Sequence, residues 1–230
     1  NMKKTLIAIA LSAASISSAS ALDVTIALTN LTHGSHFTPL LFSAHAADQH
    51  LFQVGSAASS NLQAMAEGGD TAGLNTDLTN LNADSHNAAG LTAPGHSETF
   101  NLMTQTTNTH LSVVGMVLPT NDGFVGLDAL QIPTTAGTYT YYLNAYDAGT
   151  EANDEIINGA GAPGAAGIPA DPLGSGGSGA TGIAGNDSNT NVHIHRGVIG
   201  DTDATGGPSD LDSRVHRWLN PVARLVIEVN

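Results

Sequence analysis

Alternating apolar and polar residues mark several segments of the chain as half-buried β-strands. The first is 23–31, DVTIALTNL, in which Val24, Ile26 and Leu28 fall on one face. Further strands are expected in four later segments, at 97–104, 110–118, 138–146 and 222–229. Proline and glycine residues separate these segments, as is common between antiparallel strands. The pattern predicts an all-β fold with the architecture of an antiparallel β-sandwich.

Two short helices are expected between the first and second of these strands. Residues 56–66, SAASSNLQAMA, contain serines suited to capping a helix, and Gly68 and Gly69 follow as a stop signal. The polar segment 71–82 carries leucines three or four positions apart, which indicates a second short helix. The domain is therefore expected to be mainly β with short helices added.

The segment 158–190 differs in composition from the rest of the chain. Glycine and alanine dominate it, and large apolar residues are almost absent. Such a segment buries too little surface to offset the entropy lost on ordering, and too few residues follow it to build a second core. We expect a long loop or a flexible insertion within a single domain that spans residues 22–230.

The first 21 residues have the order of a secretory signal peptide. Lys3 and Lys4 precede an apolar run from Leu6 to Leu11, and small residues lead to an A-x-A cleavage site that ends at Ala21. We expect cleavage near Ala21 and a secreted or periplasmic protein. The apolar run is too short to cross a bilayer, so no membrane span is expected.

Without this segment the chain is strongly acidic. Its remaining basic residues are four arginines, at 196, 214, 217 and 224, against 20 aspartates and glutamates. Nucleic-acid binding requires clustered basic residues, so that class of function is excluded. The chain has no cysteine, which excludes disulfides, thiolate nucleophiles and thiolate metal ligands.

Two of the predicted strands are followed by acidic segments. After 110–118 comes PTNDGFVGLDAL, with Asp122 and Asp128, and 138–146 leads into DAGTEANDE, with Asp147 and Glu151. If both strands end at one edge of the sandwich, these carboxylates converge and repel one another unless a cation joins them. Calcium suits such loops because it binds carboxylates, backbone carbonyls and water. The alternative, which composition alone favours, is a pair of solvated acidic loops.

LPTNDGFVGLDAL and AYDAGTE resemble the paired signatures of the spondin N-type domain family, which includes F-spondin, mindin and secreted bacterial proteins. NLTHGSHFTPLLFSAH, VHIHRGVIG and HRWLNPVARLVIEV extend the resemblance over residues 23–229. It implies an antiparallel β-sandwich related to calcium-binding membrane-targeting domains, with a calcium ion at the loops of one end. It places Asp122 and Asp147 at the ion, with Glu151 as the second acid of its loop. For Asp128 it leaves open a metal-binding or a sheet-facing role.

A second acidic segment, GDTDATGGPSDLD, has the spacing of an EF-hand calcium loop. Asp201, Asp203, Thr205 and Asp212 fall at its positions 1, 3, 5 and 12. Position 12 is aspartate where the motif has glutamate, and the flanking sequence does not indicate helices. The segment is either a second calcium site or an acidic turn that matches by chance.

Two histidines alternate in VHIHRG, so on a strand His193 and His195 would share one face. Paired histidines can bind zinc or copper, but the sequence assigns no third ligand. The alternative is that they hydrogen-bond to loop carbonyls or to neighbouring acids. In a functional role, we expect them to orient the calcium-binding loops without touching the ion.

Together these features indicate an exported, non-enzymatic calcium-binding module for adhesion, matrix or surface interaction. Its partner would be an extracellular protein or glycan, or a second copy of the chain. No nucleophile elbow of the GxSxG type is present. Two other functions stay open: a self-assembling structural subunit of an extracellular matrix or filament, and a metal-dependent hydrolase that uses the acidic loop end.

Overall fold

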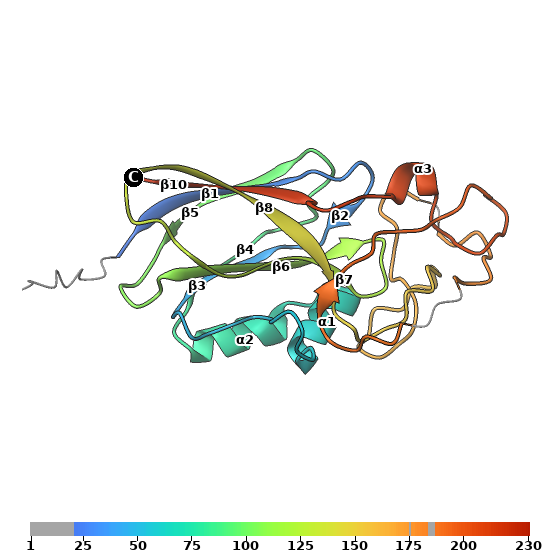
Figure 1. The fold of residues 1–230 in the computed structure, drawn as a ribbon, viewed down its shortest axis with the longest axis horizontal. Helices are drawn as coiled ribbons and strands as arrows, with labels where there is room; N and C mark the ends of the chain where they lie inside the picture. The colour runs from blue at the N-terminus through green and yellow to red at the C-terminus, as the bar shows by residue number, and fades with distance from the viewer. Residues whose placement is uncertain (1–20, 175, 184–186) are drawn as a thin grey trace, which may run out of the picture.

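The computed structural model describes residues 21–174, 176–183 and 187–230. The predicted signal peptide, except for Ala21, lies outside the described residues. Ten strands form one antiparallel sheet in the order β4-β3-β6-β7-β8-β10-β1-β5, with β2 added to β6 and β9 to β8. The sheet folds into two facing layers, so the predicted all-β sandwich is confirmed (Figure 1).

The longer strands carry most of this sheet. They are β1 (Asp23–Asn30), β5 (Ser97–Met103), β6 (His110–Leu118), β7 (Gly123–Gln131), β8 (Gly137–Asp147) and β10 (Ala223–Val229). The shorter ones are β2 (His36–Phe37), β3 (Leu41–His45), β4 (Asp84–Asn87) and β9 (His193–Ile194). Five of these, β1, β5, β6, β8 and β10, match the five predicted strands to within one residue at either end.

Strand β8 joins the two layers of the sandwich. Its first part, residues 137–143, pairs with β10, and its last part, residues 144–147, pairs with β7. Figure 1 shows it crossing diagonally from one layer to the other. This crossing brings the C-terminal end of β8 beside the start of β7, where both predicted acidic segments lie.

Both predicted helices form, although the first begins later than expected. Helix α1 spans Ser60–Gly68, because the Ser59 hydroxyl accepts a hydrogen bond from the Leu62 amide and caps the first turn. Gly69 ends it in the left-handed conformation, with φ of 72°. Helix α2 spans Ala72–Asn80, and a third, four-residue helix, α3, spans Ser213–His216.

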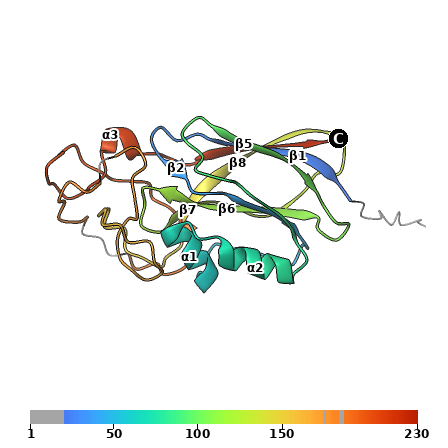
Figure 2. The same ribbon diagram turned by 180° about the vertical axis from the view of Figure 1, so that it is seen from behind.

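Apolar side chains fill two regions of the interior. The larger cluster lies between the layers, where Ile26, Phe42 and Leu225 are fully buried. The second lies between α1, α2 and the layer formed by β3, β6 and β7, and it contains Met65 and Phe124. The helices therefore cover one outer face of the sandwich (Figure 2).

The interpretation of PTNDGFVGLDAL, residues 119–130, as a loop is wrong, because most of it lies in strand β7 (Gly123–Gln131). Glycines within this segment weaken the strand signal. One of them is needed for packing: a Cβ at Gly126 would lie 2.7 Å from the Phe52 ring. The strand can therefore pass close beneath an aromatic side chain.

The inserted segment 158–190 lies between β8 and β9. Its described residues fold against the end of the sandwich, where Ile168 is fully buried with Val198 and Leu211. The Gly164 amide donates to the buried Glu67 carboxylate at 2.6 Å. Hydrogen bonds to acidic side chains supply much of the order that apolar burial does not.

The described part of the chain contains no helix with the length and apolar character that crossing a membrane demands.

Candidate functional site

The two acidic segments meet at one end of the sandwich. Gly123 pairs with Asp147 in the antiparallel ladder between β7 and β8. Asp122, which directly precedes Gly123, therefore lies next to Asp147 at the end of the strand pair. Both side chains are buried, with exposed fractions of 0% and 2%. Two carboxylates therefore lie close together out of solvent.

Only one of the two oxygens of the Asp122 carboxylate has hydrogen-bond partners. Its Oδ2 accepts hydrogen bonds from the backbone amides of Thr150 and Glu151, at 2.8 and 3.1 Å. Its Oδ1 is buried and has no hydrogen-bond partner. Burial, and then the charge of Asp147, raise the pKa of Asp122 from its ordinary value to about 7.

Asp147 is held in place by its own loop. Its Oδ1 accepts from the Gly149 amide at 2.8 Å, and its Oδ2 accepts from Asn153 Nδ2 at 2.7 Å. Gly149 has a φ of 71°, and a Cβ there would lie 2.6 Å from the backbone of Thr190. The turn after β8 therefore depends on glycine, both for its conformation and for its close contact with a distant segment.

Glu151 faces the inserted segment as well as the acidic pair. Its Oε1 accepts hydrogen bonds from Asn121 Nδ2 at 2.8 Å and from the Gly167 amide. Its Oε2 is buried without a partner, and burial raises the pKa of this carboxyl. Glu151 thus links the loop after β8 to the 158–190 segment.

Asp128 lies apart from the other three acids. It is six positions along β7 from Asp122, roughly 20 Å at about 3.3 Å per strand residue. Its Oδ2 pairs with His50 Nδ1 at 2.8 Å, and burial raises the pKa of its carboxyl. Asp128 therefore contacts the segment between β3 and α1, and it lies far from the acidic end.

Both histidines of VHIHRG lie beside Asp147. His193 pairs with it in the β8–β9 ladder, and its Nδ1 lies 3.7 Å from Asp147 Oδ1 while donating to the Asn191 carbonyl at 2.8 Å. His195 is 5% exposed, and its Nδ1 accepts from the Gly197 amide at 2.9 Å. Burial lowers the pKa of His195 to about 4, so its ring is neutral with the proton on Nε2.

The EF-hand-like segment is organised by its own backbone. Asp201 accepts from the amides of Asp203 and Ser209, and Asp203 accepts from the Thr205 amide. Asp212 caps the four-residue α3 and pairs with Arg214 at 2.7 Å. The carboxylates of this segment are thus engaged with nearby donors. Among the described residues, the segment is preceded by no helix and followed by the four-residue α3, which is shorter than the helices that flank an EF-hand loop.

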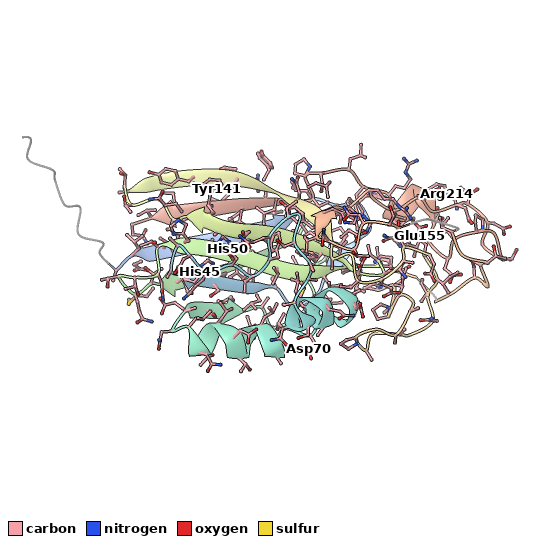
Figure 3. The ribbon with its side chains drawn as sticks, turned by 60° about the horizontal axis from the view of Figure 1, so that its bottom comes forward. His45, His50, Asp70, Tyr141, Glu155 and Arg214 are labelled. Carbon is pink, nitrogen blue, oxygen red and sulfur yellow. The ribbon has the colours of Figure 1, made fainter. Side chains whose placement is uncertain are left out.

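Glu155 belongs to the same acidic segment, DAGTEANDE, where the sequence alone predicts a solvent-exposed side chain, and this prediction is wrong. Its side chain is 4% exposed, and its two oxygens accept from the amides of Ile199 and Gly200 at 2.7 and 2.8 Å. Its Oε2 also accepts from Ser209 Oγ at 2.6 Å. Figure 3 shows Glu155 among the loops at this end of the molecule. Glu155 therefore holds the 197–212 loop against the sandwich.

Across the described residues, no group of three or more histidine, aspartate or glutamate side chains is arranged to hold a metal ion. A calcium ion at this end would therefore depend on Asp122 and Asp147 and take its other ligands from backbone carbonyls and water. The unpartnered Asp122 Oδ1 fits that requirement, because a buried carboxylate oxygen needs a donor or a cation.

The model of the Spondin_N family matches residues 29–156, more than half of the chain. The chain belongs to the Spondin_N family. The matched region contains Asp122, Asp147 and Glu151, and it ends before the inserted segment, β9 and β10. None of the curated proteins matches the chain. Membership of the Spondin_N family indicates an extracellular module of the adhesion type.

Proposed function

We propose that this Spondin_N protein is an exported module that binds one calcium ion at the acidic end of the sandwich and uses that end for adhesion, matrix or surface interaction. The observation that carries the proposal is the buried, unpartnered Oδ1 of Asp122 beside the buried carboxylate of Asp147. Residues 1–21 have the pattern of the signal for export.

The charge arrangement favours a hard cation at this end. Asp122 and Asp147 bring two negative charges out of solvent, and no lysine or arginine forms an ion pair with either of them in the described structure. Repulsion between two such charges amounts to a few kcal/mol at intermediate dielectric. A calcium ion offsets this repulsion, and loops of this kind supply the carbonyl oxygens that it also requires.

Asp122 and Asp147 are the residues that would bind the ion directly, with Glu151 as the third acid of the site. Asn153 holds Asp147 from one side, and His193 lies on the other. When bound, calcium neutralises the carboxylates and fixes the loops that carry them. The 158–190 segment is tied to the same loops through Glu151, so ion binding would also order a wide loop surface for a protein or glycan partner.

Thermal melting with and without calcium tests this proposal. We expect millimolar calcium to raise the melting temperature of the wild-type protein and to have no such effect on Asp147→Ala. Asp48→Ala, which removes an exposed acid elsewhere, is the matched control and should respond to calcium as the wild type does. A wild type that is not stabilised by calcium, or an Asp147→Ala variant that keeps the whole effect, would contradict the proposed site.

Size-exclusion chromatography with and without calcium distinguishes binding of another molecule from self-association. A module that binds another molecule is expected to elute as a monomer with and without calcium. Growth of the particle in calcium would instead favour self-association as the use of this surface.

A further inference from the structure

A cavity of about 360 Å³ lies on the helix-covered side of the sandwich. Its walls come from α1, α2 and the segment 45–59 that connects β3 to α1. None of Asp122, Asp147 or Glu151 lines it. In Figure 3 the labels of His45 and His50 mark this region, toward the opposite end of the sheet from Glu155. The cavity is therefore separate from the acidic end.

Most of the cavity wall is apolar and firmly held. Phe52, Leu62, Leu74 and Leu78 line it, and each is at most 5% exposed because it also packs into the cluster beneath the helices. Phe52 is fixed further by an edge-to-face contact with Phe124, with ring centroids 5.0 Å apart. These side chains form a preformed apolar surface, which is typical of small-molecule sites.

The histidines at the cavity already have partners. His45 is fully buried; its Nδ1 donates to the Ala46 carbonyl at 2.8 Å, so its Nε2 accepts from the Ser112 hydroxyl at 2.7 Å. His50 is engaged through Nδ1 with Asp128. The Oε1 of Gln49, by contrast, is buried and has no hydrogen-bond partner, although Gln49 lines the cavity. A small rotation of this side chain towards the cavity would let a ligand donate to the oxygen.

The charge around the cavity also favours a ligand that carries hydrogen-bond donors and a positive charge. Asp77 lines it, and one of its oxygens, Oδ2, accepts from Asn61 Nδ2 at 2.6 Å. The arginines of the mature chain all lie beyond position 195, and none of them lines the cavity. An anionic ligand would therefore meet the Asp77 carboxylate and no lysine or arginine, and both lining histidines already have partners. A cation would be attracted to Asp77 and to the acidic protein as a whole.

We propose that this cavity binds a small amphipathic amine, with its apolar body against the leucines and its ammonium group directed to Gln49 and Asp77. The volume corresponds to about a dozen non-hydrogen atoms, at roughly 30 Å³ for each water-sized unit. A phenyl or short alkyl chain with one amino group fits this volume, can pack against the apolar wall and can donate to the unsatisfied acceptor.

Three compounds of nearly equal size test the chemistry: 4-phenylbutylamine, 4-phenylbutanol and 4-phenylbutyrate. Calorimetric titration of the full chain, supported by saturation-transfer NMR, should show binding of the amine at least about tenfold tighter than that of the carboxylate, with the alcohol between them. The amine affinity should be the same with and without calcium, because the acidic end does not contribute. Equal binding of amine and carboxylate, or no binding of the amine at millimolar concentration, overturns the proposal.

Substitutions at the cavity identify the site of binding. Ala57→Trp places a large side chain into the cavity from an exposed position and should reduce the amine affinity more than about tenfold. Gln49→Leu should weaken the amine and the alcohol, and Asp77→Asn should remove most of the preference for amine over carboxylate. Ala89→Trp, at an exposed position outside the cavity, should bind like the wild type.

Melting curves establish that each variant is folded before its affinity is compared. If Ala57→Trp does not fold, Gln49→Leu and Asp77→Asn still decide the question, since both change side chains that are not part of the apolar core. Unchanged amine binding in the folded cavity variants, or an equal loss in Ala89→Trp, would show that the amine binds elsewhere.

Discussion

Asp122→Asn isolates the electrostatic cost that a calcium ion would relieve at the acidic end. Asparagine retains a side-chain oxygen that can accept from the Thr150 and Glu151 amides, as Asp122 Oδ2 does. It also replaces the buried, unpartnered Oδ1 with an amide group and removes the negative charge next to Asp147. The substitution therefore changes the charge while keeping the shape and most of the hydrogen bonding.

The size of the effect follows from the pKa of Asp122, which rises from an ordinary 3.8 to about 7 in the folded protein. Between these values the folded chain binds more protons than the unfolded chain, so the free energy of unfolding falls as pH rises. About three pH units at roughly 1.4 kcal/mol each amount to about 4 kcal/mol. In calcium-free buffer at pH 8, Asp122→Asn should therefore be the more stable protein by up to about 4 kcal/mol, or roughly 10 °C in melting temperature.

The assay is urea or thermal unfolding of both proteins with a chelator at several pH values between 4 and 8. The measured quantity is the difference between the unfolding free energies of the two proteins at each pH. This difference removes the contribution of groups that both proteins share, such as His195. It should be near zero at pH 4, grow with pH and level off above pH 7, and calcium should reverse its sign because only the wild type keeps both carboxylates. A difference that is the same at every pH, or a wild type that is the more stable protein at pH 8 without calcium, would refute the reasoning.

Three further predictions concern the packing and protonation around this end. Gly123→Ala should destabilise the protein by about 1–3 kcal/mol in thermal melting, because a Cβ there would lie 2.9 Å from the His195 ring, whereas Gly90→Ala, with open space around it, should not. Glu155→Gln should increase the hydrogen-exchange rate of the Ile199 amide at least several-fold by weakening its acceptor; an unchanged rate would show that this hydrogen bond does not hold the loop. The pKa of His195, lowered to about 4, means that its ring stays neutral at pH 6 and that its contribution to stability is lost as pH falls from 6.5 towards 4; an NMR titration that shows protonation near pH 6.5 would contradict this.

The strands that could be predicted from the sequence are those with one face in the core and one towards solvent. In β1, Val24, Ile26 and Leu28 alternate with polar residues and are all fully buried, so periodicity alone locates the strand. β3 gives no such signal, because all five of its residues are buried and apolar positions do not alternate. β7 gives a weak signal because its glycines resemble turn residues, although one of them, Gly126, is required for packing against Phe52.

The candidate site was predictable only in part, for a similar reason. The approach of Asp122 to Asp147 depends on the pairing of β7 with the last residues of β8, a tertiary contact that two acidic segments in sequence suggest but do not require. The role of Glu155 depends on amides more than 40 positions away, at Ile199 and Gly200, and no local pattern marks it. The inserted segment has few large apolar residues, and its composition does not indicate the hydrogen bonds that it makes to carboxylates such as Asp210.

The two outermost strands of the sheet, β4 and β5, meet through side chains and are not joined by a backbone ladder. His86 of β4 stacks on Phe100 of β5 with ring centroids 3.7 Å apart, and its Nε2 lies 3.0 Å from Glu98 Oε1. An open strand edge is a template for adding strands from other chains, which is a common route to aggregation. Here each edge shields the other, so an extracellular protein without disulfides can remain separate from its neighbours at high local concentration. Loss of the His86 ring would expose both edges at once.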